Sequence, residues 1–333
     1  MSSQIKNIVT VGASAGGISA VSRLCAGFSE DMDAAIFIVI HVSKGSLIEI
    51  VLRQIQKGCK LPCKIPADGE SIKNGHVYLA PPDHHMMLEP GKIAVRNGAY
   101  ENHWRPSVDV LFRTAAAAYD SCVTGIILTG MLDDGSSGMV AIKRSGGRCM
   151  VQDPEEAEFS DMPSNVISNV EVDYKGSLDE IGYVLSDLYT RTECEKGNVP
   201  EDIKLEAGIT LRMSSNSDEL EKLGPLTHFT CPGCGGSLVK IQNDNVSRYR
   251  CYTGHSFTEK SLYEEQLKAS EESLWVAIRM MEERKNLLSE MSTFESTSRL
   301  ERSTQLGIHI KRLKEMLQQL GPREAESNTQ LEI

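Results

Sequence analysis

The stretch NIVTVGASAGG (residues 7–17) decides the fold that the sequence predicts. Its first six residues are a short, apolar and β-branched run that ends in glycine, as buried β-strands often do. A helix-compatible stretch follows from Ala15 to about Ala26. The segment therefore predicts a strand, a glycine-rich turn and a helix, which together form the repeating unit of a parallel sheet.

The same alternation continues along the chain. Further apolar runs cover residues 35–41, 123–129 and 148–152, and a helical repeat of apolar residues covers 48–55. Strands that are apolar throughout and alternate with helices are typical of a parallel sheet covered on both faces. Residues 62–98 break this rhythm with turns and short alternating runs, so we expect a hairpin insertion there. We predict an α/β fold with a doubly wound, mostly parallel sheet.

Length and composition limit the class of protein. The chain has 333 residues, 40% of them hydrophobic and 24% charged, which is typical of folded globular protein of about two domains. The 46 acidic and 35 basic residues give a net charge of −11, which disfavours nucleic-acid binding. Without a signal peptide or a run of about 18 apolar residues, we expect a cytoplasmic protein that is not inserted in a membrane.

The nine cysteines, an odd number, also favour a reducing compartment. Six of them are scattered, and we expect small core or surface residues at these positions: Cys25, Cys59, Cys63, Cys122, Cys149 and Cys194. The other three are clustered near the C-terminus and are considered below.

The turn Gly12-Ala-Ser14-Ala-Gly16-Gly17 contains a candidate nucleophile. In G-x-S-x-G at a strand-to-helix turn, the serine hydroxyl is exposed at the carboxyl edge of the sheet, beside the helix N-terminus. Two other interpretations stay open. The turn could bind phosphate, although Ser14 stands where the G-x-G-x-x-G pattern has its second glycine. It could also be purely structural.

Two further strand ends supply matching partners. His41 ends the second apolar run, and Asp133 and Asp134 follow the third. Because the carboxyl ends of parallel strands meet at one edge, a serine, a histidine and an aspartate are expected together there, as in a hydrolytic triad. The chain order Ser, His, Asp differs from that of α/β-hydrolases, which run Ser, Asp or Glu, His. The order points to another family.

Several ordered segments resemble the catalytic domain of chemotaxis protein-glutamate methylesterases of the CheB type. They are GASAGG (12–17), VYLAPPDHHM (77–86), RPSVDVLF (105–112), LTGMLDDGSSGM (128–139) and QDPEEAEFSDMPSNVI (152–167). The resemblance implies the Rossmann-like fold of that family. It also implies that Ser14 is the nucleophile, His41 the general base and Asp134 the acid. By the same resemblance, Ala15 and Met131 line the site and supply oxyanion donors.

The activity implied by the resemblance is hydrolysis of glutamyl methyl esters on a methylated chemoreceptor-like protein, and deamidation of glutamine is a related reaction of the family. No cofactor is expected for catalysis. The chain begins a few residues before the first strand, so we expect no N-terminal receiver domain. Ala15 stands where the family commonly has threonine. The alternative interpretation is a catalytically weak signalling scaffold that binds partners through its C-terminal region.

A second cluster lies near the C-terminus. Cys231 and Cys234 form C-x2-C, and Cys251 and His255 form C-x3-H, with 16 residues between the pairs. Three thiolates and one imidazole suit a closed tetrahedral zinc site, so we predict structural zinc in a zinc-ribbon-like module. A redox dithiol and incidental cysteines are the alternatives.

The sequence predicts five consecutive regions. We expect a catalytic domain (1–192), a linker (193–228), the zinc-ribbon-like module (229–257), a helical hairpin (258–321) and a disordered tail (322–333). The hairpin helices could pack together or on the catalytic domain, or bind a partner or a second copy. His84 and His85 are adjacent on a strand and therefore point to opposite faces, which argues against a metal site. Trp104 and Arg105 could contact the receptor or cap a helix.

Overall fold

The structure, a computed structural model, describes residues 7–191, 194, 197–290 and 296–320. The chain divides into two compact units, residues 1–259 and 260–333. Each unit is described by itself. The expected tail at 322–333 lies outside the described residues.

The first unit is built on a seven-stranded sheet in which all neighbouring strands are parallel. Its order is β10-β9-β8-β1-β2-β5-β3. The strands are β1 (Ile8–Ala13), β2 (Ala35–Ile40), β3 (Cys63–Lys64), β5 (His76–Leu79), β8 (Val123–Ile127), β9 (Arg148–Gln152) and β10 (Tyr174–Gly176). The predicted α/β fold with a doubly wound parallel sheet is confirmed.

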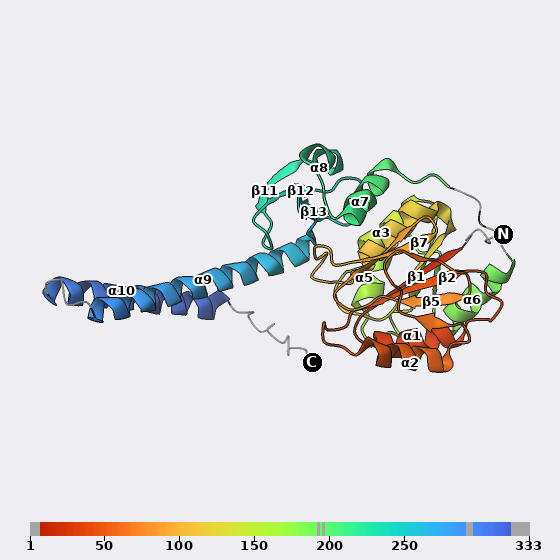
Figure 1. Ribbon diagram of the computed structural model, residues 1–333, viewed down its shortest axis with the longest axis horizontal. Helices are drawn as coiled ribbons and strands as arrows, with labels where there is room; N and C mark the ends of the chain where they lie inside the picture. The colour runs from red at the N-terminus through yellow and green to blue at the C-terminus, as the bar shows by residue number, and fades with distance from the viewer. Residues whose placement is uncertain (1–6, 192–193, 195–196, 291–295, 321–333) are drawn as a thin grey trace, which may run out of the picture. The chain divides into compact units, whose positions relative to one another are not determined.

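Helices cover both faces of this sheet. One apolar cluster joins it to α1 (Gly17–Ala26), α2 (Ile48–Gly58) and α6 (Leu178–Arg191). A second cluster joins the other face to α3 (Val108–Tyr119), α4 (Ser136–Arg144) and α5 (Asp161–Asn169). Figure 1 shows α1 and α2 on one side of β1 and β2, and α3 on the other. Alternate strand residues supply the two clusters, because side chains of a strand point to opposite faces.

The expected hairpin insertion is correct in part. Strands β6 (His85–Glu89) and β7 (Lys92–Arg96) form an antiparallel hairpin, with β4 (Glu70–Ser71) beside β7. However, β3 and β5 of the same segment belong to the main sheet. The four residues of β5, HVYL, carry too little pattern for the sequence to distinguish a strand of the main sheet from one of the hairpin.

The interpretation of 193–228 as a linker is wrong. This range contains α7 (Glu201–Arg212) and α8 (Ser217–Leu223), and β11 (Leu226–Thr230) begins before its end. Five residues of α7 are buried, among them Glu206. The polar appearance of the helix was misleading because some of its buried residues are charged or hydroxylated.

The cysteine and histidine cluster lies in a four-stranded antiparallel sheet. Its strands are β11, β12 (Ser237–Lys240), β13 (Arg248–Cys251) and β14 (Ser256–Thr258), paired in that order. Residues 226–258 are called the Cys/His module below. Part of its apolar surface packs with α7 and α8, through Val239, Ile241 and their neighbours Ile209, Leu220 and Leu223.

The second unit contains α9 (Glu259–Glu290), which begins one residue before it, and α10 (Ser296–Leu320). Lys314 of α10 forms an ion pair with Glu282 of α9 at 2.7 Å. Among the helices that the structure describes, none is both long enough and apolar enough to cross a bilayer.

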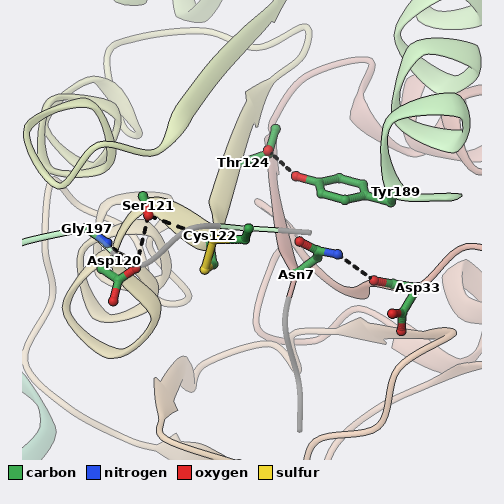
Figure 2. Close-up of a disulfide and its surroundings, with 9 residues drawn as sticks. Asn7, Asp33, Asp120, Ser121, Cys122, Thr124, Tyr189 and Gly197 are labelled. Atoms are coloured by element: carbon green, nitrogen blue, oxygen red, sulfur yellow. Dashed lines mark hydrogen bonds between the residues drawn. A yellow bond between two sulfur atoms is a disulfide. The ribbon is translucent and has the colours of Figure 1, made fainter. Parts of the chain in front are cut away.

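Two of the scattered cysteines form a disulfide. Cys122, directly before β8, is bonded to Cys194, with their Cα atoms 5.3 Å apart (Figure 2). Beside it, Asp120 accepts a hydrogen bond from the amide of Gly197 at 3.1 Å, so a second contact holds the same segment. This corrects the expectation of isolated thiols at 122 and 194. The cysteine count therefore no longer argues for a reducing compartment.

Candidate active site

The parallel register brings the predicted triad residues to one edge of the sheet. Ala13 of β1 pairs with Ile40 of β2, so Ser14 and His41 are the next residues on neighbouring strands. The amide of His41 donates to the carbonyl of Ala13 at 3.1 Å, which continues this pairing beyond the strands. Both residues therefore leave the sheet at its carboxyl edge, where α/β folds place their sites.

The turn that carries Ser14 is fixed on both sides. The amide of Ser14 donates to the carbonyl of Thr129 at 3.0 Å, and the amide of Gly17 donates to the carbonyl of Ser14 at 2.8 Å. Gly16 has a φ of +73°, a left-handed conformation that glycine adopts without strain. Gly130 approaches closely, since a Cβ there would lie 2.8 Å from the Cβ of Ser14. Backbone thus packs tightly around the serine.

His41 and Asp134 form a buried pair. Nε2 of His41 lies 2.8 Å from Oδ2 of Asp134, and both side chains are fully buried. The aspartate that reaches the histidine is Asp134 rather than Asp133, as the resemblance implied.

The carboxylate of Asp134 is also held by the N-terminus of α3. Oδ1 accepts from the hydroxyl of Ser107 at 2.9 Å and from the amide of Asp109 at 3.1 Å. Oδ2 accepts from the amide of Val108 at 2.7 Å. All of these groups are donors, and a helix N-terminus favours negative charge, so the contacts stabilise an ionised carboxylate.

The second nitrogen of His41 is available for chemistry. Among the residues that the structure describes, Nδ1 is buried and has no hydrogen-bond partner, and no hydrogen bond joins Ser14 to His41. The indole of Trp104 stacks on the imidazole, with ring centroids 4.0 Å apart and planes 6° from parallel. Asp134 and Trp104 together restrain the histidine ring in position and in tilt.

The sequence comparison decides the family. Residues 9–185, more than half of the chain, match the CheB methylesterase family. The chain belongs to this family. It is a family of serine hydrolases, so the predicted class of enzyme is confirmed.

Individual relatives support this assignment. A protein of Leptospira interrogans is 39% identical over 174 residues, which cover 52% of this chain and 90% of the relative. A protein-glutamate methylesterase/protein-glutamine glutaminase 2 of Rhizobium johnstonii is 35% identical over 188 residues, covering 54% of this chain and 50% of the relative. Both activities also appear in the name of the Leptospira protein.

A solved structure shows the same fold. The crystal structure of the Thermotoga maritima CheB methylesterase catalytic domain matches with a TM-score of 0.52 and 30% sequence identity. The match covers 55% of this chain and 98% of the Thermotoga domain. The methylesterase domain therefore accounts for the sheet and its helices.

The two other predicted residues of the methylesterase site are the sequence neighbours of Ser14 and of Gly130. Ala15 follows it directly, and its carbonyl accepts from the hydroxyl of Thr129 at 3.1 Å. Met131 follows Gly130, and its side chain is 49% exposed. Both positions lie next to the tight contact between Ser14 and Gly130. The roles expected for Ala15 and Met131 stay predictions.

A second buried carboxylate of the methylesterase domain, that of Asp109, binds backbone next to Asp134. Asp109 accepts from the amides of Gly135 at 3.0 Å and Gly138 at 2.6 Å, and from Asn102 at 2.9 Å. Burial and the nearby Asp134 raise the pKa of Asp109 well above its usual value. Asp109 therefore ties α3 to the turn that carries Asp134.

Sequence reasoning missed three of these contributors. Ser107 and Asp109 lie in the RPSVDVLF segment that carried the resemblance, and Ser107 as N-cap before an apolar helical run was a readable signal. The stacking of Trp104 on His41 had no such signal. Arg105 binds Asp83 at 2.7 Å and the carbonyl of Gly98 at 2.6 Å, which is neither of the roles considered for it.

The Cys/His module contains the second candidate site. The ligand atoms of Cys231, Cys234, Cys251 and His255 all lie within 4.8 Å of one another. Each pair is presented by a tight turn: the amide of Gly235 donates to the carbonyl of Cys231 at 2.8 Å, and that of Gly254 to Cys251 at 3.1 Å. Three sulfurs and one imidazole nitrogen at this spacing fit a tetrahedral zinc ion.

The pair His84 and His85 was considered as a metal site in the sequence. In the structure, both ring nitrogens of His85 have protein partners, Ala99 and Ser107.

Proposed function

We propose that the chain is a protein-glutamate methylesterase that hydrolyses glutamyl methyl esters on a methylated chemoreceptor-like protein, with Ser14, His41 and Asp134 as its triad. The observation that carries the proposal is the buried His41–Asp134 hydrogen bond of 2.8 Å, formed beside the Ser14 turn. Membership of the methylesterase family supports the substrate class.

The hydrogen bonds indicate the direction of proton transfer. Asp134 accepts from three other donors, so its ionised carboxylate also accepts from Nε2–H of His41. Nδ1 of the neutral ring then carries the lone pair. Nδ1 is therefore the atom that takes the Ser14 proton. The hydrogen bond from the Ser14 hydroxyl to Nδ1 forms when substrate binds.

The reaction follows from these roles. The Oγ of Ser14 attacks the ester carbonyl carbon while its proton passes to Nδ1 of His41, and the resulting oxyanion is stabilised by the amides near Ala15 and Met131. The C–O bond to the methoxy group breaks, and His41 returns the proton so that methanol leaves. Water then attacks the acyl-enzyme, again through His41, releasing the glutamate carboxylate and the free serine.

The same triad supports a second reaction. A glutamine amide presents the same carbonyl, with ammonia in place of methanol as the leaving group. The names of the relatives from Leptospira interrogans and Rhizobium johnstonii join both activities, which favours deamidation as the second candidate.

The test is methanol release from methylated chemoreceptor membranes. We expect wild-type protein to release methanol, and Ser14→Ala to reduce the rate by at least ~10³-fold because the nucleophile is lost. Ser19→Ala is the matched control, since Ser19 is exposed in the first turn of α1. Folded wild-type protein that releases neither methanol nor ammonia would contradict the proposal.

We also propose that Cys231, Cys234, Cys251 and His255 hold a structural zinc ion. All four positions of the tetrahedron are supplied by protein, which leaves none for a reacting water. One equivalent of zinc per chain is expected in purified protein, and Cys234→Ser should abolish it. Cys63→Ser, at a half-buried thiol of the methylesterase domain, should leave the metal content unchanged.

A further inference from the structure

The loop that carries Trp104 is a tight turn. Glu101 and Trp104 pair across a tight turn, with Trp104 N donating to Glu101 O at 2.9 Å. The two residues between them, Asn102 and His103, have φ values of +48° and +70°. Consecutive positive φ values characterise the two-residue turns of β-hairpins. For residues other than glycine this conformation costs free energy and persists where the surroundings enforce it.

The Cys/His module supplies those surroundings. Strand β14 lies along the loop: the amide of Asn102 donates to the carbonyl of Ser256 at 2.9 Å, and the amide of Ser256 donates to the carbonyl of Tyr100 at 3.3 Å. The side chain of Asn102 accepts from the amide of Thr258 at 2.9 Å. An isolated β-bridge between Glu101 and Ser256 therefore joins the loop to β14, at the edge of the module's sheet.

The candidate metal ligands fix the strand that makes these contacts. Cys251 ends β13 and His255 directly precedes β14, and the amide of Cys251 donates to the carbonyl of His255 at 2.9 Å. A metal ion bound by both residues would close the β13–β14 turn. The position of Ser256 against the loop would then depend on the metal.

Buried charges join the same elements. Glu101 accepts from Arg250 of β13 at 2.9 Å and from Arg113 of α3 at 3.0 Å, and these three side chains are at most 2% exposed. The first residue of the tight turn is thus bound to the module through Arg250 and to the methylesterase domain through Arg113. Separating them would leave buried charges unpaired, which is strongly unfavourable.

We propose that Trp104 is a positioning residue for His41 and that the Cys/His module holds Trp104 in place. The inference rests on the proposed function, in which His41 is the general base. The contact at 4.0 Å covers one face of the imidazole, while Asp134 holds its edge. Releasing the loop removes the stack and lets the ring tilt, so the reaction slows although the triad is intact.

The first experiment tests Trp104 itself. We expect Trp104→Ala to lower kcat for methanol release by about 10-fold or more with KM nearly unchanged, because misplacement of a reacting group lowers the rate of the chemical step. Trp104→Phe keeps an aromatic face and should restore most of the rate. The matched control is Trp275→Phe, at a 53% exposed indole of α9. Equal kcat for wild type and Trp104→Ala would overturn the proposal.

The second experiment tests the link to the module, and its fluorescence readout needs no substrate. The chain has two tryptophans, so Trp275→Phe leaves Trp104 as the only one. The emission of an indole depends on the ring that covers its face, so His41→Gln should change the emission spectrum of Trp104 at fixed pH. Adding Cys234→Ser, which removes a candidate metal ligand, should release the loop, so that His41→Gln no longer changes the emission, and should lower kcat. Adding Cys63→Ser should change neither result.

The outcomes separate the two proposals. A folded, metal-free Cys234→Ser protein that keeps both the emission change on His41→Gln and wild-type kcat would overturn the role of the module. Wild-type protein without Ser14-dependent hydrolysis would overturn the proposed function instead. In that case, the emission change on His41→Gln would still show whether the module holds Trp104 against His41.

Discussion

The methylesterase sheet and the Cys/His module are stabilised by different forces. On the sheet, apolar side chains from β1, β2 and β8 fill both faces, and the largest of them are fully buried. The module has a much smaller apolar cluster, which it shares with α7 and α8. Its interior contains instead a candidate metal site and buried ion pairs of Arg248 and Arg250.

This difference determines which perturbations each region resists. Burial of apolar area stabilises a fold without depending on pH or on metal supply. Thiolate ligands and ion pairs act only while their groups carry the right charge and have their partners. The module should therefore fail under chelation or acid while the sheet persists, and the sheet should respond most to cavities in its core.

Metal removal should give the largest separation. Structural zinc contributes about 10–16 kcal/mol in small zinc-binding peptides, far more than so small an apolar cluster provides. After chelation, we expect hydrogen exchange to accelerate in β12 and β13 and to stay slow in β1, β2 and β8. Unchanged protection of β13 in metal-free protein would contradict the contrast.

A cavity in the sheet should have the opposite effect. Phe37 is fully buried on β2 and stacks on Tyr78 with centroids 5.1 Å apart. Phe37→Ala should lower the free energy of unfolding of the methylesterase domain by about 3–5 kcal/mol, measured by denaturant titration. Phe229→Ala is the control in the module, where the ring is 46% exposed, and a loss below ~1 kcal/mol is expected. Equal losses would remove the distinction.

Breaking the buried ion pairs that join α7 to the module and to α3 should have an effect of similar size. Glu206 lies 2.9 Å from Arg248 and 3.4 Å from Arg113, with its side chain 6% exposed. Glu206→Gln leaves buried guanidinium groups without a counter-charge, which we expect to cost about 3 kcal/mol. Glu201→Gln on the same helix, at a side chain 88% exposed, should change stability by less than ~0.5 kcal/mol. Urea titration of both variants gives the comparison.

Acid should weaken the same network. Burial opposes ionisation of Glu101, but Arg113 and Arg250 outweigh it and hold the pKa of Glu101 at about 2. A carboxyl whose pKa is lowered on folding stabilises the fold above its unfolded pKa of about 4.3 and loses that contribution as pH falls toward 2. The stability difference between wild type and Glu101→Gln should therefore be constant above about pH 5 and shrink below it. A difference that stays constant down to pH 3 would contradict this role of Glu101.

The sequence could predict that Ser14, His41 and Asp134 come to one edge of the sheet because the information needed is local. Ser14, His41 and Asp134 each come after a strand, and parallel strands end at one edge, so their proximity needed no knowledge of distant contacts. The same holds for the Cys/His cluster, whose two pairs each lie within a short turn. Both predictions used spacing along the chain.

The contacts that join the two regions were not predictable in this way. Glu206 in EDIKLEAGITLR resembles a residue on the solvent face of a polar helix, and only the fold brings Arg248 and Arg250 to it. Trp104 is directed at His41 by a turn that the module enforces. The bond from Cys122 to Cys194 likewise has no signature, since it joins distant residues of no particular motif. In each case the partner is specified by tertiary structure alone.

The smallest effect on stability is expected at an ion pair that has the same chemistry but is exposed to solvent. Arg23 of α1 binds Asp179 of α6 with two nitrogens, as Arg248 binds Glu206. However, the side chains of Arg23 and Asp179 are 54% and 65% exposed. Water and salt screen such a pair, so Arg23→Ala should cost below ~1 kcal/mol, and less at high ionic strength. Urea titration at low and high salt measures both. A loss as large as that of Glu206→Gln would mean that two-nitrogen geometry, rather than burial, sets the strength of these contacts, and the proposed contrast between sheet and module would lose its physical basis.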